Sequence, residues 1–141
     1  MKINVFKEQF TISGSTKEYT SARLNAKFAF TYGRVEVRAK LPESGGTWPA
    51  IWTLGVDVNE TGNYFGDQFG AVGWPLSGEI DIMEYVGKTP HEIHTTLHTP
   101  SSFGQSINTN VETLENIEEG FHVYKTNWSK DAIKFYIDNQ L

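Results

Sequence analysis

The stretch GEIDIMEYVG, residues 78–87, contains three carboxylates within six residues: Glu79, Asp81 and Glu84. The residues between them are apolar, as in a β-strand that buries one face. Successive side chains of a strand point to opposite faces, so Glu79 and Asp81 share one face. Glu84 falls out of phase and, in a regular strand, would point into the core. An uncompensated carboxylate there costs several kcal/mol. A β-bulge at Ile82-Met83 would return Glu84 to the acidic face, and we predict one there.

Two carboxylates on one face, one ionised and one protonated, are what glycoside hydrolysis requires. The middle acid would hydrogen-bond to a neighbour and separate the protonation behaviour of the outer two. A retaining enzyme holds its pair about 5–5.5 Å apart, which demands a sheet that is concave on the acidic side. Two other interpretations stay open at this point. Alternating acids can form a solvated face, and acids in a row can bind Ca²⁺, although the glycines of an EF-hand loop are missing.

The composition of the chain argues against several classes of partner and of structure. Its 141 residues carry a net charge of −5 without a basic cluster, which argues against nucleic acid as a partner. No apolar run approaches a membrane span, and residues 1–10 alternate rather than form the apolar core of a signal peptide. The chain has no cysteine, so it forms no disulfide. Aromatic residues make up 13%, which fits a β-rich core or aromatic platforms for sugars.

Period-two alternation predicts antiparallel strands over residues 22–30, 35–41 and 133–137, with turns between them. A short helical turn over residues 110–119 is also compatible with the sequence. Residues 57–75 are rich in glycine and aromatic residues, and we expect an ordered loop that borders a cleft. The fold class is therefore all-β, a sandwich or a barrel.

The histidines raise the question of a metal. His94 and His98 would be a zinc-binding pair on a helix, but the residues around them favour a strand. We therefore predict no metal site. We expect His98 to face the cleft and to touch Glu84 or substrate, and we expect His122 and Trp128 to be structural.

The stretch GEIDIME resembles the bulged Glu-x-Asp-x-x-Glu motif of glycoside hydrolase family 16. Further laminarinase-like blocks occur in order at residues 19–42, 46–55, 74–87, 93–104 and 121–140. The resemblance implies a β-jelly-roll of two curved antiparallel sheets with a sugar cleft across the concave one. It implies Glu79 as nucleophile, Glu84 as general acid/base and Asp81 as a helper, with no cofactor. A structural calcium occurs in the family, but the sequence identifies no site for it.

Aromatic and cationic side chains near the acids are candidates for substrate binding. Trp74 precedes Glu79 by five residues and is the strongest stacking candidate. Trp48 and Trp52 are further candidates, with core packing as the alternative, above all for Trp52. Arg23 is expected to reach sugar hydroxyls unless it is simply exposed.

The resemblance favours an endo-acting retaining hydrolase of β-1,3-glucan, or of mixed β-1,3-1,4-glucan, that acts as a monomer outside the cell or in the periplasm. A non-catalytic carbohydrate-binding fragment and a transglycosylase of the same family are the alternatives. The match is incomplete at both ends of the chain, so we expect residues 1–141 to form one partial catalytic domain.

Overall fold

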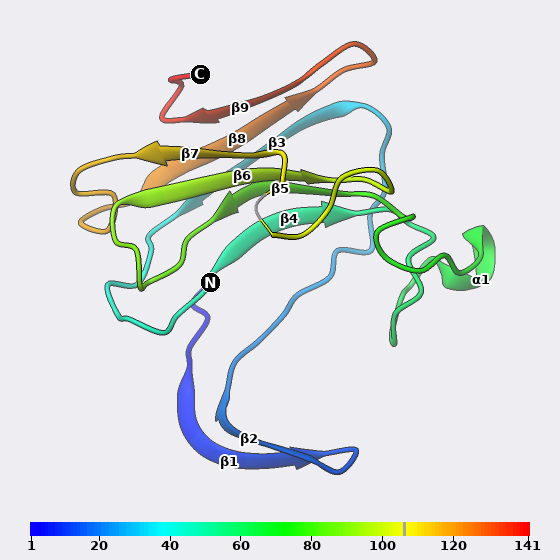
Figure 1. Ribbon diagram of the computed structural model, residues 1–141, viewed down its shortest axis with the longest axis horizontal. Helices are drawn as coiled ribbons and strands as arrows, with labels where there is room; N and C mark the ends of the chain where they lie inside the picture. Colours follow the sequence, from blue (N-terminus) through cyan, green and yellow to red (C-terminus); the bar gives the residue numbers. More distant parts are fainter. Residues whose placement is uncertain (106) are drawn as a thin grey trace.

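A computed structural model describes residues 1–105 and 107–141 of the chain. In this part of the chain the regular secondary structure is almost entirely β-strand, with a single helical turn (Figure 1). The elements are β1 (Phe6–Ile12), β2 (Ser15–Thr20), β3 (Gly33–Ala39), β4 (Ala50–Leu54), α1 (Gly66–Phe69), β5 (Glu79–Glu84), β6 (Glu92–His98), β7 (Thr109–Thr113), β8 (His122–Trp128) and β9 (Ile133–Ile137).

The strands form two antiparallel sheets and a separate hairpin. One sheet has the order β4-β5-β6-β7 and the other has the order β3-β8-β9, while β1 pairs only with β2. The alternating stretch at residues 35–41 lies in β3 as far as Ala39, and the stretch at residues 133–137 is β9, so strands occur where those two predictions placed them. The all-β sandwich of antiparallel sheets expected from the sequence is confirmed as well.

Two local predictions were wrong. Residues 22–30 alternate between apolar and polar residues up to Phe28 but form no strand. This segment has no partner strand beside it, and alternation alone cannot supply ladder hydrogen bonds. Of the predicted helical turn over residues 110–119, residues 109–113 instead form β7, because they pair with residues 92–96 of β6, and only residues 115–119 form a turn.

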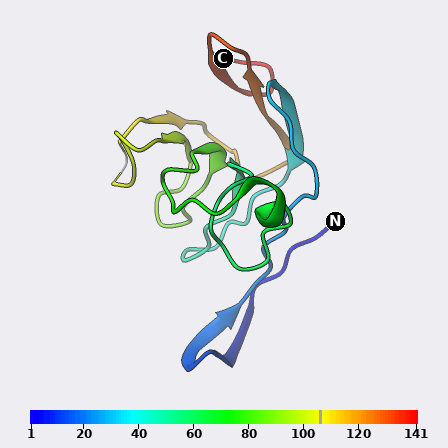
Figure 2. The ribbon, with the colours of Figure 1, turned by 90° about the vertical axis from the view of Figure 1, so that its right-hand side faces the viewer.

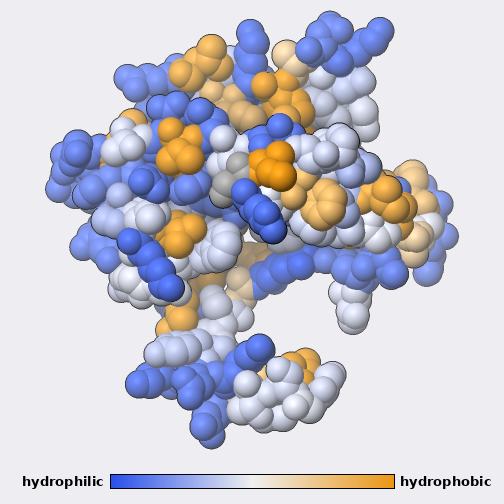
Figure 3. All heavy atoms as spheres, in the orientation of Figure 1, coloured by the Kyte–Doolittle hydropathy of each residue, from blue (hydrophilic) through white to orange (hydrophobic). Residues whose placement is uncertain are grey.

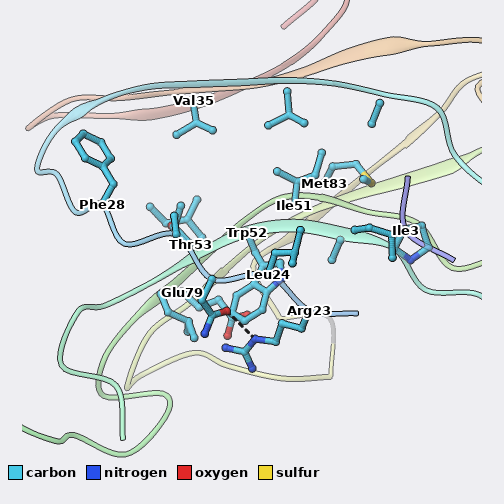
Figure 4. Close-up of a pocket in the computed structure, with 18 of the residues that line it drawn as sticks. Ile3, Arg23, Leu24, Phe28, Val35, Ile51, Trp52, Thr53, Glu79 and Met83 are labelled. Atoms are coloured by element: carbon cyan, nitrogen blue, oxygen red, sulfur yellow. Dashed lines mark hydrogen bonds between the residues drawn. The ribbon is translucent and has the colours of Figure 1, made fainter. Parts of the chain in front are cut away.

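The core lies between the two sheets. It contains the fully buried side chains of Ile82, Met83 and Ile93 from one sheet and of Tyr124 from the other. Figure 4 shows Ile51 and Met83 pointing from their sheet toward Val35 of the facing one. Burying one such aliphatic side chain contributes about 1.5–3 kcal/mol. The opposite face of β5 is thereby left free to carry polar groups.

The hairpin of β1 and β2 extends away from the two sheets (Figures 1 and 2). The space-filling view shows an open hollow between the hairpin and the main body (Figure 3). A groove of about 2640 Å³ passes through this region, and its lining includes Arg23, Trp52 and Glu79. The hollow therefore reaches the acidic strand.

The long segment 57–75 is an ordered loop, as predicted. The side-chain amide of Asn63 donates to the carbonyl oxygens of Val56 and Val58, each at 2.9 Å. A bridge between Val58 and Val72 closes the base of the loop.

None of the helices in the described residues has the length and apolar character that a membrane span requires.

Candidate active site

The acidic strand β5 contains the predicted bulge. Along β4, Ile51 pairs with Met83 while the next residue, Trp52, pairs with Asp81. One residue of β5, Ile82, is therefore extra. The same irregularity lies between Asp81 and Glu84 in the pairing with β6. The phase of the strand shifts at this point, so Glu84 joins the face that carries Glu79 and Asp81.

Asp81 is the buried centre of the acidic face, with 3% of its surface exposed. Its side chain hydrogen-bonds to Glu79, and its Oδ2 lies 3.1 Å from Nε2 of His98. Burial, together with the negative charges of Glu79 and Glu84, raises the pKa of Asp81 to about 8 from its ordinary 3.8. The middle acid therefore holds a proton at neutral pH and can donate it to Glu79.

Each of the two outer acids accepts a hydrogen bond from the indole of a tryptophan. Nε1 of Trp74 donates to Glu79 at 2.5 Å, and Nε1 of Trp48 donates to Glu84 at 3.0 Å. The two tryptophans are 46% and 67% exposed, so their rings also present surface to the solvent. Trp74 and Trp48 thus lie at the site as expected, and both serve as hydrogen-bond donors to the carboxylates.

Glu84 has a second neighbour that the sequence analysis did not identify. The hydroxyl of Thr96 lies 3.5 Å from Oε2 of Glu84 and 3.1 Å from the hydroxyl of Thr109 on the next strand. Thr96 lies two residues before His98 on β6, so the period of two that placed His98 in the cleft also places Thr96 there.

Trp52 and Arg23 form a second cluster on the acidic side of the sheet. Figure 4 shows both lying on the same side of β4 as Glu79. The guanidinium of Arg23 stacks 4.4 Å from the centre of the Trp52 ring and forms an ion pair with Glu60 at 2.5 Å. Trp52 is directly opposite Asp81 in the sheet, so it faces the acids rather than the core. The core-packing alternative for Trp52 was wrong.

The predicted contact of His98 with an acid occurs, but the acid is Asp81 rather than Glu84. The bulge moves Glu84 opposite His94, four residues away along β6. Nε2 of His94 lies 3.7 Å from Glu92, so the two imidazoles face different carboxylates. Among the described residues, no group of three His, Cys, Asp or Glu side chains could hold a metal ion.

His122 and Trp128 have structural contacts. Nδ1 of His122 lies 2.6 Å from Oδ2 of Asp138, and Trp128 packs edge-on against Phe30 and Tyr32. These contacts lie on the β3-β8-β9 sheet, away from the acids.

The raised pKa of Asp81 predicts a specific dependence of stability on pH. The folded protein keeps this proton up to about pH 8, while the unfolded chain loses it near pH 3.8. Folding therefore takes up a proton between these values, and the free energy of unfolding falls as pH rises through this window. Asp81→Asn cannot titrate, so its free energy of unfolding should fall less from pH 4 to pH 8. Denaturant unfolding at a series of pH values measures this, with the exposed Asp131→Asn as control. Parallel curves for Asp81→Asn and wild type would contradict the assignment.

The two indole donors predict matched losses of activity. Trp74→Phe and Trp48→Phe each keep an aromatic ring but remove a hydrogen bond to a carboxylate, worth about 1.5–3 kcal/mol. For the glucan hydrolysis expected from the acidic motif, each should lower kcat/KM about 10- to 100-fold. Trp128→Phe, on the other sheet, is the control. Equal values for all three variants would show that the indole N–H groups do not matter.

Comparison with known proteins supplies the family. The family described as Glycosyl hydrolases family 16 matches residues 2–141. The chain belongs to this family. The all-β architecture and the bulged acidic strand agree with that membership.

Solved structures and curated relatives support the same assignment. LamAcat from Zobellia galactanivorans superposes with a TM-score of 0.87 at 50% identity, covering 97% of this chain and 55% of that one. The laminarinase catalytic domain from Thermotoga maritima gives 0.82 at 38% identity, covering 99% and 53%. A beta-glucanase from Rhodothermus marinus is 40% identical over 134 residues, which are 89% of this chain and 42% of the relative. The chain thus spans 42–55% of the length of these three proteins.

Proposed function

We propose that the protein is an endo-acting, retaining β-1,3-glucan hydrolase, in which Glu79 is the nucleophile and Glu84 the general acid/base. The observation that carries this proposal is the bulged strand, which puts both carboxylates on one face around a buried Asp81. A surface of solvated acids would not bury the middle one. Two exposed indoles bound to the outer acids also favour a sugar-binding site over a bare acidic face.

In the proposed mechanism each acid has a role that follows from the resemblance to the family. Protonated Glu84 gives its proton to the glycosidic oxygen while the Glu79 carboxylate bonds to the anomeric carbon and the leaving sugar departs. Ionised Glu84 then takes a proton from water, whose oxygen displaces Glu79 and restores both groups. Asp81 donates a hydrogen bond to Glu79 and so fixes the orientation of that carboxylate before it attacks the anomeric carbon. Every proton in this cycle moves between the acids, the sugar and water, so no cofactor takes part.

The names of relatives support β-1,3-glucan as the substrate. The Thermotoga maritima protein is a laminarinase, and a relative from Cryptopygus antarcticus, 34% identical, is a glucan endo-1,3-beta-glucosidase. A polymer of this kind is met outside the cell or in the periplasm, which is where we propose that the protein acts.

Product analysis tests this function. The 141-residue protein is incubated with laminarin, lichenan and agarose, and the released oligosaccharides are separated. We expect laminarin to yield a ladder of short oligosaccharides from the earliest times, as internal cleavage produces. Release from agarose alone would contradict the β-1,3 assignment, and release of glucose alone would contradict endo action.

A binding protein without turnover is the second candidate. A beta-1,3-glucan-binding protein from Penaeus monodon is 39% identical over 137 residues, covering 86% of this chain and 34% of that protein. The intact pair of glutamates favours an enzyme, because a binder needs no two acids on one face. Binding of laminarin without any release of reducing ends would favour the binder. Transfer of the glycosyl unit to an added sugar, in preference to water, would identify a transglycosylase.

A further inference from the structure

We propose that the segment 99–105, which follows β6, positions the Glu79–Asp81 pair: the Gly104 N–H fixes the His98 tautomer that donates to Asp81. His98 is then a positioning residue that acts through Asp81. The significance for catalysis rests on the proposed function, whereas the tautomer itself does not.

The segment is folded back onto the end of β6 by its own hydrogen bonds. Backbone bonds join Thr99 and Ser102 in both directions, at 2.8 and 3.0 Å. The side-chain amide of Asn108 donates to the hydroxyl of Ser102 at 2.7 Å. This tight turn returns the chain toward His98. Gly104 then adopts a left-handed backbone with φ of 62°, which glycine reaches without strain.

The contacts of His98 select one tautomer of its ring. The backbone N–H of Gly104 donates to Nδ1 at 3.1 Å, so Nδ1 must carry a lone pair rather than a proton. The proton of the neutral ring therefore lies on Nε2, which is 3.1 Å from Oδ2 of Asp81. The His98 side chain is 14% exposed, so water is largely excluded from competing for these bonds. If the proton were on Nδ1, that N–H and the N–H of Gly104 would point at each other. Oδ2 of Asp81 would then face the lone pair of Nε2.

The contact between Nε2–H of His98 and Oδ2 of Asp81 determines which oxygen of Asp81 carries the proton. Oδ2 faces the Nε2–H of His98 at 3.1 Å, so we infer that the proton of the neutral carboxyl group is on Oδ1, from which it can be donated to Glu79. The burial and neighbouring charges that keep Asp81 protonated agree with this arrangement. His98 thus determines which oxygen of Asp81 serves Glu79.

The same segment supports Glu79 by a second route. Phe103, the neighbour of Gly104, packs edge-on against Trp74 with ring centres 5.5 Å apart. Trp74 also packs against His98, at 5.4 Å, and donates to Glu79. Two chains of contact therefore run from adjacent residues of one turn to the same carboxylate.

The direct test is the tautomer of His98 in solution. Two-bond ¹⁵N–¹H spectra of the ¹⁵N-labelled protein at about pH 8, where ordinary imidazoles are neutral, show which ring nitrogen carries the proton. We expect Nε2–H for His98. His122 provides an internal control, since its Nδ1 faces the Asp138 carboxylate and should be protonated. Finding the proton of His98 on Nδ1 would overturn the proposal, whether or not the protein cleaves any glucan.

Two variants separate the contacts of His98. Gln places an amide N–H where Nε2 lies, and Asn places a carbonyl oxygen where Nδ1 lies. We expect His98→Gln to lose less kcat than His98→Asn, because it keeps a donor to Asp81, while the Gly104 amide loses protection from hydrogen exchange. We expect His98→Asn to keep that protection but to lose kcat about 10- to 100-fold with KM little changed, because the donor to Asp81 is gone.

The pattern of results decides between positioning and simple packing. Equal losses of kcat in the two variants, or an equally protected Gly104 amide in both, would overturn the proposal. If neither the wild type nor any variant turns over laminarin, the proposed function fails. The tautomer and the exchange of the Gly104 amide still test the proposal itself.

Discussion

Replacing Glu79 by Gln is expected to lower the rate of laminarin hydrolysis about 10⁴-fold, because the amide cannot form the bond to the anomeric carbon. The substitution keeps the size of the side chain, and its amide oxygen can still accept from Trp74 and Asp81. Binding of laminarin should therefore stay within a few-fold of wild type. Initial rates and isothermal titration of the same preparation measure the two quantities.

The matched control for this variant is Glu36→Gln. Glu36 lies on β3 of the other sheet, pairs with Arg34 and is exposed, so its rate should equal that of wild type. A Glu79→Gln variant that retains a tenth or more of the wild-type rate would remove Glu79 from the role of nucleophile.

Replacing Glu84 by Ala is expected to cost about 10²- to 10⁴-fold in rate, the usual contribution of a general acid/base. The loss should be small for formation of the glycosyl-enzyme from a substrate whose leaving group needs no proton. Hydrolysis of the glycosyl-enzyme, which regenerates the free enzyme, should then be slow, because no base activates water. Azide needs no base, so it should restore turnover and yield a β-glycosyl azide of retained configuration.

The azide product separates the two glutamates. With Glu79→Ala, azide would instead attack the substrate directly and yield the inverted α-glycosyl azide. A β-azide from the Glu79 variant and an α-azide from the Glu84 variant would mean that the two roles are exchanged. Absence of rescue in both, with Glu84→Ala folded, would contradict the assignment of Glu84 as acid/base.

The acidic strand was predictable in detail because two simple rules conflict there. Alternation would put Glu84 in the core, and the cost of an unpaired buried charge forbids it, so the bulge follows. The structure has the bulge where it was expected, at Ile82. The same pairing explains why the partner of His98 was predicted wrongly. A bulge changes which residues face each other across β5 and β6, and sequence spacing does not show the new register.

Other features depend on contacts that are distant in the sequence. Arg23 stacks on Trp52 and pairs with Glu60, and no local pattern relates these three residues. The alternating residues 22–30 form no strand, since period two marks the capacity to pair and not the presence of a partner. The role of Gly104 rests on one backbone N–H, which every residue except proline carries. Only the fold shows that this amide reaches His98.

Trapping the covalent intermediate tests the central claim most directly. The protein is incubated with a 2-deoxy-2-fluoro laminaribiosyl fluoride, digested, and its peptides are weighed and sequenced by mass spectrometry. We predict one added fluorolaminaribiosyl unit on the side chain of Glu79. An adduct on Glu84, or hydrolysis of laminarin with inversion and no adduct on any residue, would contradict the account.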